Sequence, residues 1–223
     1  MHGCIKGNEK KIYLKHGDEL NIECMCSCGF AVEEIKFVAK EQSIDLIIMG
    51  TQGTGNLTEK LIGSNTTSLM REIKSPLLAI DKHIRFREIK KIVLACDYTE
   101  VDKKSIFDPL KEFIHSCKSH LYVLNVVPEL EVVPSVEKAV EGIKLNCLLD
   151  DVDHSFHCLE KEDIVGGIND FVVQYKMDMV VLIPHKRSII KNIFHRSATR
   201  HMAFHTSVPL LVIHLSLIHI SEP

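Results

Sequence analysis

Short apolar runs alternate with amphipathic segments along most of the chain. Runs such as Asp45–Met49, Pro76–Ile80 and Lys91–Cys96 place branched aliphatic residues in succession, which is typical of strands buried on both faces of a parallel sheet. Segments such as Ala31–Gln42 instead place apolar residues at helical spacing beside Glu and Lys, as in a helix with one face on a core. This alternation predicts an α/β fold.

The pattern of strands occurs twice. Asp178–Leu182 matches Asp45–Met49, and Pro209–Ile213 matches Pro76–Ile80, in both cases at an offset of 133 residues (178 − 45 and 209 − 76) and without a gap. A fixed offset of this kind predicts an internal repeat. We therefore expect two tandem α/β domains with parallel sheets.

The two predicted copies differ in extent. In the second copy a strand from Lys91, a helix over Ile106–Cys117 and a strand over His120–Val127 precede the repeated part, and the first copy has no counterparts at this offset. The sequence thus predicts a first domain over residues 1–84 that lacks its N-terminal strand, helix and strand. It predicts a complete second domain over residues 88–215.

Composition narrows the class of protein. The 223 residues, 45% of them hydrophobic, can supply one large core or two small ones. A net charge of −3, from 27 basic and 30 acidic residues, argues against binding to nucleic acid or an anionic membrane. Without a membrane span or secretion signal, and with eight cysteines expected as reduced thiols, the chain is expected to be cytoplasmic. Residues 216–223 are expected to form a non-structural tail.

Glycines follow the first strand of the repeat. Gly50 and Gly53 come directly after Asp45–Met49, and Gly63 precedes Ser64, which we expect to cap a helix. Glycine allows close approach of the backbone to a ligand, and a helix N-terminus offers N–H groups and positive partial charge. The stretch predicts an anion cradle. It has neither a Walker lysine nor the dinucleotide glycine spacing; the plainer alternative is a simple strand-to-helix turn.

The spacing Gly-x2-Gly-x9-Gly-Ser resembles the signature of ATP-binding members of the universal stress protein family, and the repeat resembles the tandem two-domain form of that family. The resemblance implies a five-stranded parallel sheet in the strand order 3-2-1-4-5. It also implies that ATP, with Mg²⁺ as a candidate companion, is bound through its phosphates by seven loop residues. These are Gly50, Thr51, Gln52, Gly53, Gly63, Ser64 and Asn65.

The second copy has lost this signature. Its aligned positions hold Ile183, Lys186, Arg196 and Ser197, and the bulky side chains would occupy the phosphate space. The resemblance places Asp97, after the first strand of this copy, at the adenosine side of a nucleotide. Because the first copy lacks such a strand, we expect the missing wall of its site to come from another chain or from the second copy.

Together these features predict a regulatory or stress-response protein that binds adenine nucleotide and is not an enzyme, acting as a homodimer or through pairing of its two domains. The alternative is an interaction scaffold of the same fold that pairs through Pro76–Ile80 and Pro209–Ile213 without a nucleotide. No carboxylate, base and nucleophile fall at a diagnostic spacing, so no catalytic residue is predicted.

Two clusters of metal-ligand residue types were considered. Cys24, Cys26 and Cys28 alternate on an extended segment, and His157 with Cys158 falls near the aligned place in the second copy. Neither cluster has the second ligand pair that a structural zinc site uses. The sequence therefore predicts no metal site.

Overall fold

The computed structural model describes most of the chain in separate stretches. The described residues are 5–6, 10–13, 19–51, 63–85, 87–98, 104–127, 136–184 and 207–213. The chain divides into two compact units, Met1–Ser43 and Ile44–Pro223.

The unit Met1–Ser43 contains two antiparallel strand pairs and one helix. Its elements are β1 (Ile5–Lys6), β2 (Lys10–Tyr13), β3 (Glu19–Ile22), β4 (Met25–Cys26) and α1 (Ala31–Glu41). Strand β1 pairs with β4, and β2 with β3. The prediction of one strand over Leu20–Met25 in a parallel sheet is therefore wrong, because antiparallel partners are available from neighbouring sequence through short connections. The predicted helix is confirmed, and it buries Ala39.

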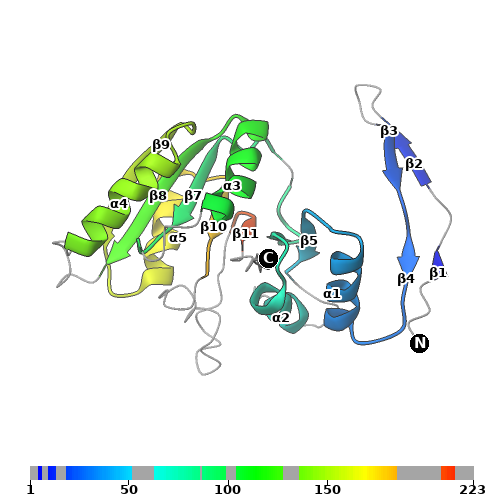
Figure 1. Cartoon of the computed structure of the whole chain (residues 1–223). Helices are drawn as coiled ribbons and strands as arrows, with labels where there is room; N and C mark the ends of the chain where they lie inside the picture. The colour runs from blue at the N-terminus through cyan, green and yellow to red at the C-terminus, as the bar shows by residue number, and fades with distance from the viewer. Residues whose placement is uncertain are drawn as a thin grey trace, which may run out of the picture. The chain divides into compact units, whose positions relative to one another are not determined.

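The unit Ile44–Pro223 is built on one sheet (Figure 1). In spatial order its strands are β5 (Ile47–Gly50), β6 (Leu77–Ile80), β11 (Leu210–Val212), β10 (Met179–Leu182), β7 (Lys91–Ala95), β8 (His120–Val127) and β9 (His154–Glu160). Every neighbouring pair is parallel except β6 with β11. The fold is an α/β fold with a mixed, mostly parallel seven-stranded sheet.

Five of the strands follow the expected order. Strands β9, β8, β7, β10 and β11 lie side by side, which is the order 3-2-1-4-5 when they are numbered along residues 88–215. Strands β5 and β6 extend the same sheet beyond β11. Strands of the two predicted domains thus share one sheet, where two separate parallel sheets were expected.

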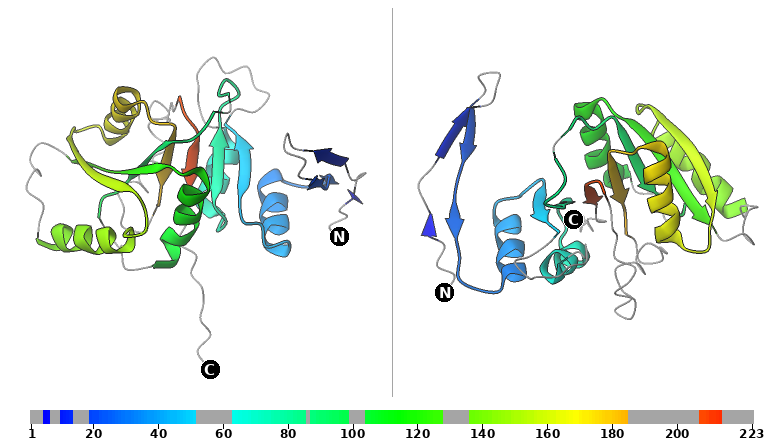
Figure 2. Two further views of the ribbon diagram at one scale, coloured as in Figure 1. Left: turned by 90° about the horizontal axis from the view of Figure 1, so that it is seen from above. Right: turned by 180° about the vertical axis from the view of Figure 1, so that it is seen from behind.

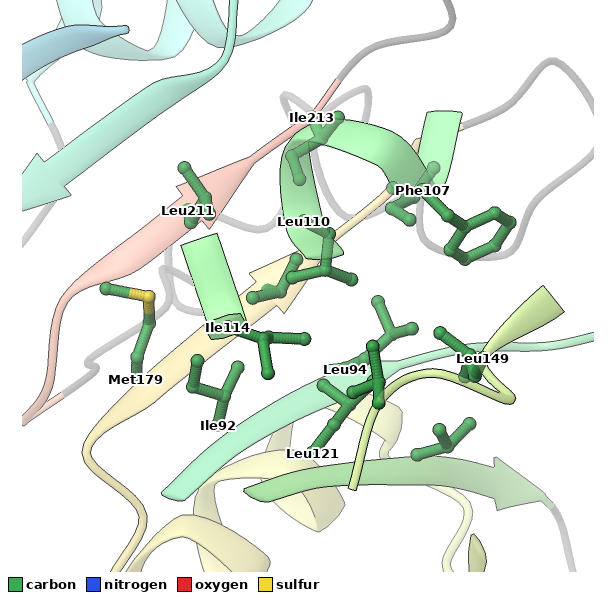
Figure 3. Close-up of a cluster of buried hydrophobic side chains, with 14 of the residues drawn as sticks. Ile92, Leu94, Phe107, Leu110, Ile114, Leu121, Leu149, Met179, Leu211 and Ile213 are labelled. Carbon is green, nitrogen blue, oxygen red and sulfur yellow. The ribbon is translucent and has the colours of Figure 1, made fainter. Parts of the chain in front are cut away.

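Helices cover both faces of the strands β7 to β10. Helices α3 (Lys104–Cys117) and α4 (Val136–Leu148) lie on one face, and α5 (Ile164–Tyr175) lies on the other (Figure 2). In the core of the first face, Ile92 and Leu94 of β7 pack with side chains of α3 that include Leu110 and Ile114 (Figure 3). Burial on both faces explains why these strands are continuous apolar runs.

The antiparallel pair β6–β11 forms a symmetric seam. Leu78 lies opposite Leu211, with Leu77 opposite Val212 and Ala79 opposite Leu210, and all six residues are buried. Leu211 is the repeat equivalent of Leu78 (211 − 78 = 133). A register that pairs a residue with its own equivalent is the arrangement found across a two-fold axis. The two runs that sequence analysis assigned to pairing therefore pair with each other within the chain.

Strand β5 differs from the prediction in its environment. It is parallel to β6, as expected, but its side chains are not buried, and Ile48 is 62% exposed. Among the described residues β5 pairs only with β6. The run over Asp45–Met49 is therefore an edge strand and not an interior one.

This contrast predicts unequal costs for the same kind of truncation. Leu211→Ala, at a seam residue that is 2% exposed, should lower the free energy of unfolding by about 2–5 kcal/mol because it leaves a cavity. Ile48→Ala on the exposed edge should cost under about 1 kcal/mol. Urea denaturation of the two variants and the wild type measures both changes, and equal costs would contradict the seam as a structural core.

Candidate functional site

The carboxyl end of β5 and the start of helix α2 (Ser64–Glu72) meet in space. The Gly63 N–H donates to the Thr51 carbonyl at 2.5 Å, and the buried Thr66 hydroxyl donates to the Gly50 carbonyl at 3.0 Å. These two bonds close the loop, so both ends of the glycine signature lie side by side. Gln52 and Gly53 lie outside the described residues.

The start of α2 is built differently from the prediction. Gly63 is the N-cap, and no side chain caps the helix, so the expectation that Ser64 is the cap is off by one residue. The Thr67 N–H donates to the Gly63 carbonyl at 2.9 Å. The amides of Ser64, Asn65 and Thr66 therefore precede the first intrahelical bond. Such amides, together with the helix dipole, suit a phosphate or another anion.

A carboxylate lies beside this loop. The Thr51 hydroxyl donates to Asp81 Oδ2 at 3.3 Å, and the His83 N–H donates to Oδ1 of the same carboxylate at 2.9 Å. The Thr51 N–H donates to the Ile80 carbonyl, which continues the β5–β6 ladder. A negative charge here opposes a bare phosphate and favours one that carries a cation. Sequence analysis missed Asp81 and Thr66 as positioning residues; the signal for Asp81 was its place directly after a strand.

Asp97 lies at the end of β7, where the chain leaves the sheet in a strained turn. Tyr98 has a φ of 55°, the left-handed region, which is uncommon for a non-glycine residue. Burial raises the pKa of Cys96 to about 12; the Tyr98 backbone N–H partly offsets this, and the charge of Asp97 adds to it. The position that aligns with Gly50 holds Ile183, which is buried in the core. The remaining aligned positions, Lys186, Arg196 and Ser197, lie outside the described residues.

The structure does not bring Asp97 to the glycine loop. Strands β5 and β6 run antiparallel to β10 and β7, so Gly50 and Asp97 lie at opposite ends of the sheet. Three strands separate β5 from β7, which is about 19 Å at the usual strand spacing. The expectation that the second copy supplies the missing wall of this site is therefore wrong within one chain.

The thiols of the N-terminal unit are exposed. Cys24, Cys26 and Cys28 are free and lie at the surface. In the stretches that the structure describes, no three His, Cys, Asp or Glu side chains are placed to hold a metal ion. Those same stretches contain no helix that is both long and apolar enough to cross a membrane.

The fold and the loop define an open α/β sheet with an anion cradle between a strand and the next helix. Residues 7–81 match the model of the universal stress protein family. This range includes the whole stretch from Gly50 to Ser64 and ends at Asp81. The match covers the first predicted copy and not the rest of the chain.

Relatives and solved structures agree with this match. A universal stress protein of Methanocaldococcus jannaschii is 37% identical over 54 residues, which is 24% of this chain and 33% of the relative. A universal stress protein of Synechocystis is 32% identical over 72 residues, 32% of this chain and 24% of the relative. The matched part thus spans between a quarter and a third of these relatives. The crystal structure of a universal stress protein from Archaeoglobus fulgidus superposes on 82% of this chain and 64% of its own, with a TM-score of 0.59 and 14% identity, which shows the fold alone.

The hydrogen bond from Thr66 to Gly50 predicts a cost for removing one hydroxyl. Thr66→Val keeps the shape of the side chain but leaves the Gly50 carbonyl without this donor, so the free energy of unfolding should fall by about 1–3 kcal/mol. Thr67→Val is the matched control, because its hydroxyl donates to a Gly63 carbonyl that the Thr67 N–H also reaches. Urea denaturation should rank Thr66→Val as the more costly change.

The raised pKa of Cys96 predicts low thiol reactivity. At pH 8 a thiol with a pKa of about 12 is almost entirely protonated, and only the thiolate reacts with iodoacetamide. Exposed Cys147 should be alkylated at least ~10-fold faster. Timed alkylation of folded protein followed by peptide mass spectrometry compares the two sites, and comparable rates would refute the burial of Cys96.

Proposed function

We propose that this chain is a universal stress protein that binds ATP through the Gly50–Ser64 loop and acts as a regulatory protein in a stress response. The observation that carries the proposal is the bond from the Gly63 N–H to the Thr51 carbonyl. It holds the two halves of the signature together beside the free amides of α2. The family match over residues 7–81 covers this same stretch.

We further propose that the chain is the tandem form of the family. Helices α1 and α5 begin at Ala31 and Ile164, again 133 residues apart (164 − 31). The seam pairs Leu78 with its equivalent Leu211. The similarity to the Archaeoglobus structure, over 82% of this chain, supports the same arrangement. The proposed domains are residues 1–84 and 88–215, with 216–223 as a tail.

In this proposal main-chain donors bind the phosphates. Glycine at positions 50 and 53 leaves room for the ligand beside the backbone, and the amides of Ser64 and Asn65 with the α2 dipole provide positive partial charge. Asp81 is placed to accept a Mg²⁺ ion that accompanies the nucleotide. Because the open edge of β5 has no neighbour among the described residues, a second copy of the chain supplies the adenosine wall of the site.

The proposal predicts selective loss of binding. Gly53→Lys should reduce ATP affinity at least ~10-fold, because a long side chain fills the space beside the loop backbone. Asp97→Ala is the control and should bind as the wild type does, since Asp97 lies at the other end of the sheet. Isothermal titration calorimetry with Mg-ATP measures both. Absence of binding by folded wild-type protein would refute the proposed function.

A second candidate is the scaffold without a nucleotide, which the intrachain seam favours because β6 and β11 pair with no ligand between them. The two proposals differ in how self-association responds to ATP. Sedimentation velocity with and without Mg-ATP separates them. A shift in association state on addition of ATP supports the nucleotide-dependent dimer, and an unchanged state supports the scaffold.

A further inference from the structure

A polar cluster lies on the face of β8 and β9 that α5 covers. Tyr122 is in register with Ser155, so His120 and Tyr122 of β8 lie on the same face as Ser155 and His157 of β9. Asp153 directly precedes β9. The cluster is at the amino end of β8, and it shares no residue with the glycine loop.

The side chains of this cluster form a continuous chain of hydrogen bonds. Asp153 Oδ2 lies 2.8 Å from His120 Nδ1, and His120 Nε2 lies 2.9 Å from Ser155 Oγ. On the other side of the hydroxyl, His157 Nε2 lies 2.9 Å from the same oxygen. Carboxylate, imidazole and hydroxyl in this order are the groups that activate a serine nucleophile.

The register of the strands holds the geometry. The Asp153 carbonyl accepts a bond from the Leu121 N–H at 2.9 Å, so the backbone beside the carboxylate is tied to the residue after His120. With the proton of His120 on Nδ1, facing Asp153, Nε2 is free to accept the serine proton. Burial, and then the nearby His120, lower the pKa of His157. Neutral His157 can donate its Nε2–H to Ser155 Oγ.

The cluster is open to solvent on one side and bounded by aromatic rings on the other. The side chains of His120 and Asp153 are 29% and 81% exposed, and β9 is the outermost strand of the sheet. The rings of Tyr122 and His157 stack with centroids 5.3 Å apart, and Phe171 of α5 lies 5.3 Å from His157. An aromatic boundary of this kind suits a small ester with an apolar acyl or aryl group.

We propose that Ser155 is a nucleophile towards acyl esters, with His120 as its general base and Asp153 as a positioning residue. Ser155 Oγ attacks the ester carbonyl carbon while its proton passes to His120 Nε2. The carbon–oxygen bond to the alcohol breaks, and the departing oxygen takes that proton. Water then attacks the acyl-serine in the same way, gives its proton to His120, and releases the carboxylic acid as the proton returns to Ser155.

This proposal is independent of ATP binding, and a covalent probe tests it directly. Full-length protein is incubated with a fluorophosphonate, and the adduct is located by peptide mass spectrometry; 4-nitrophenyl acetate hydrolysis gives the rate. The wild type should be labelled at Ser155, and Ser155→Ala should lose at least ~10-fold of the hydrolysis above buffer. Absence of an adduct, or an adduct elsewhere, would overturn the proposal without any variant.

Two further variants separate activation from a structural role. Asp153→Asn should slow labelling at least ~10-fold because it favours the wrong tautomer of His120, and Asp153→Glu should restore part of the rate. His154→Gln is the matched control, since this neighbouring ring bonds to the Val152 carbonyl and to Asn146, and it should leave labelling unchanged. Equal labelling of Asp153→Asn and the wild type would overturn the role of Asp153 and His120.

Discussion

The antiparallel contact between β6 and β11 is the interaction on which the rest of the larger unit depends. It joins two sets of parallel strands into one sheet, and it does so through aliphatic residues such as Leu78 and Leu211 that are buried on the sheet faces. Each such side chain contributes about 1.5–3 kcal/mol by burial. The same contact reverses the direction of the strands, and therefore places the glycine loop at one end of the sheet and Asp97 at the other.

The sequence allowed the strands of the sheet to be located because their burial on two faces leaves a local pattern. The runs that became β6, β7, β8, β10 and β11 are continuous and aliphatic, and the structure confirms them. The run that became β5 has the same composition, yet Ile48 is exposed. Whether a strand is interior or at an edge depends on what lies beside it, and neighbouring strands come from distant parts of the chain. Composition alone cannot distinguish the two cases.

The candidate site divides in the same way. The glycine signature is a local property of the loop and could be found by spacing alone. The bond from Thr66 to Gly50 and that from Thr51 to Asp81 depend on how β5, β6 and α2 pack, and no spacing rule predicts them. The group formed by Asp153, His120 and Ser155 was missed for the same reason: 33 residues separate His120 from Asp153 (153 − 120), and the register of two parallel strands brings them together.

Pairing across the seam takes place between segments of one polypeptide. The connection from Ile80 to Lys91 ties the two sides together, so their effective concentration is determined by a short linker and not by the amount of protein present. Dilution therefore leaves the pair intact, and neither half can exchange partners with other chains. Under that constraint the two sides can change independently: one retains Gly50 at its strand end, while the other has filled the equivalent position with Ile183, and each molecule still contains one of each.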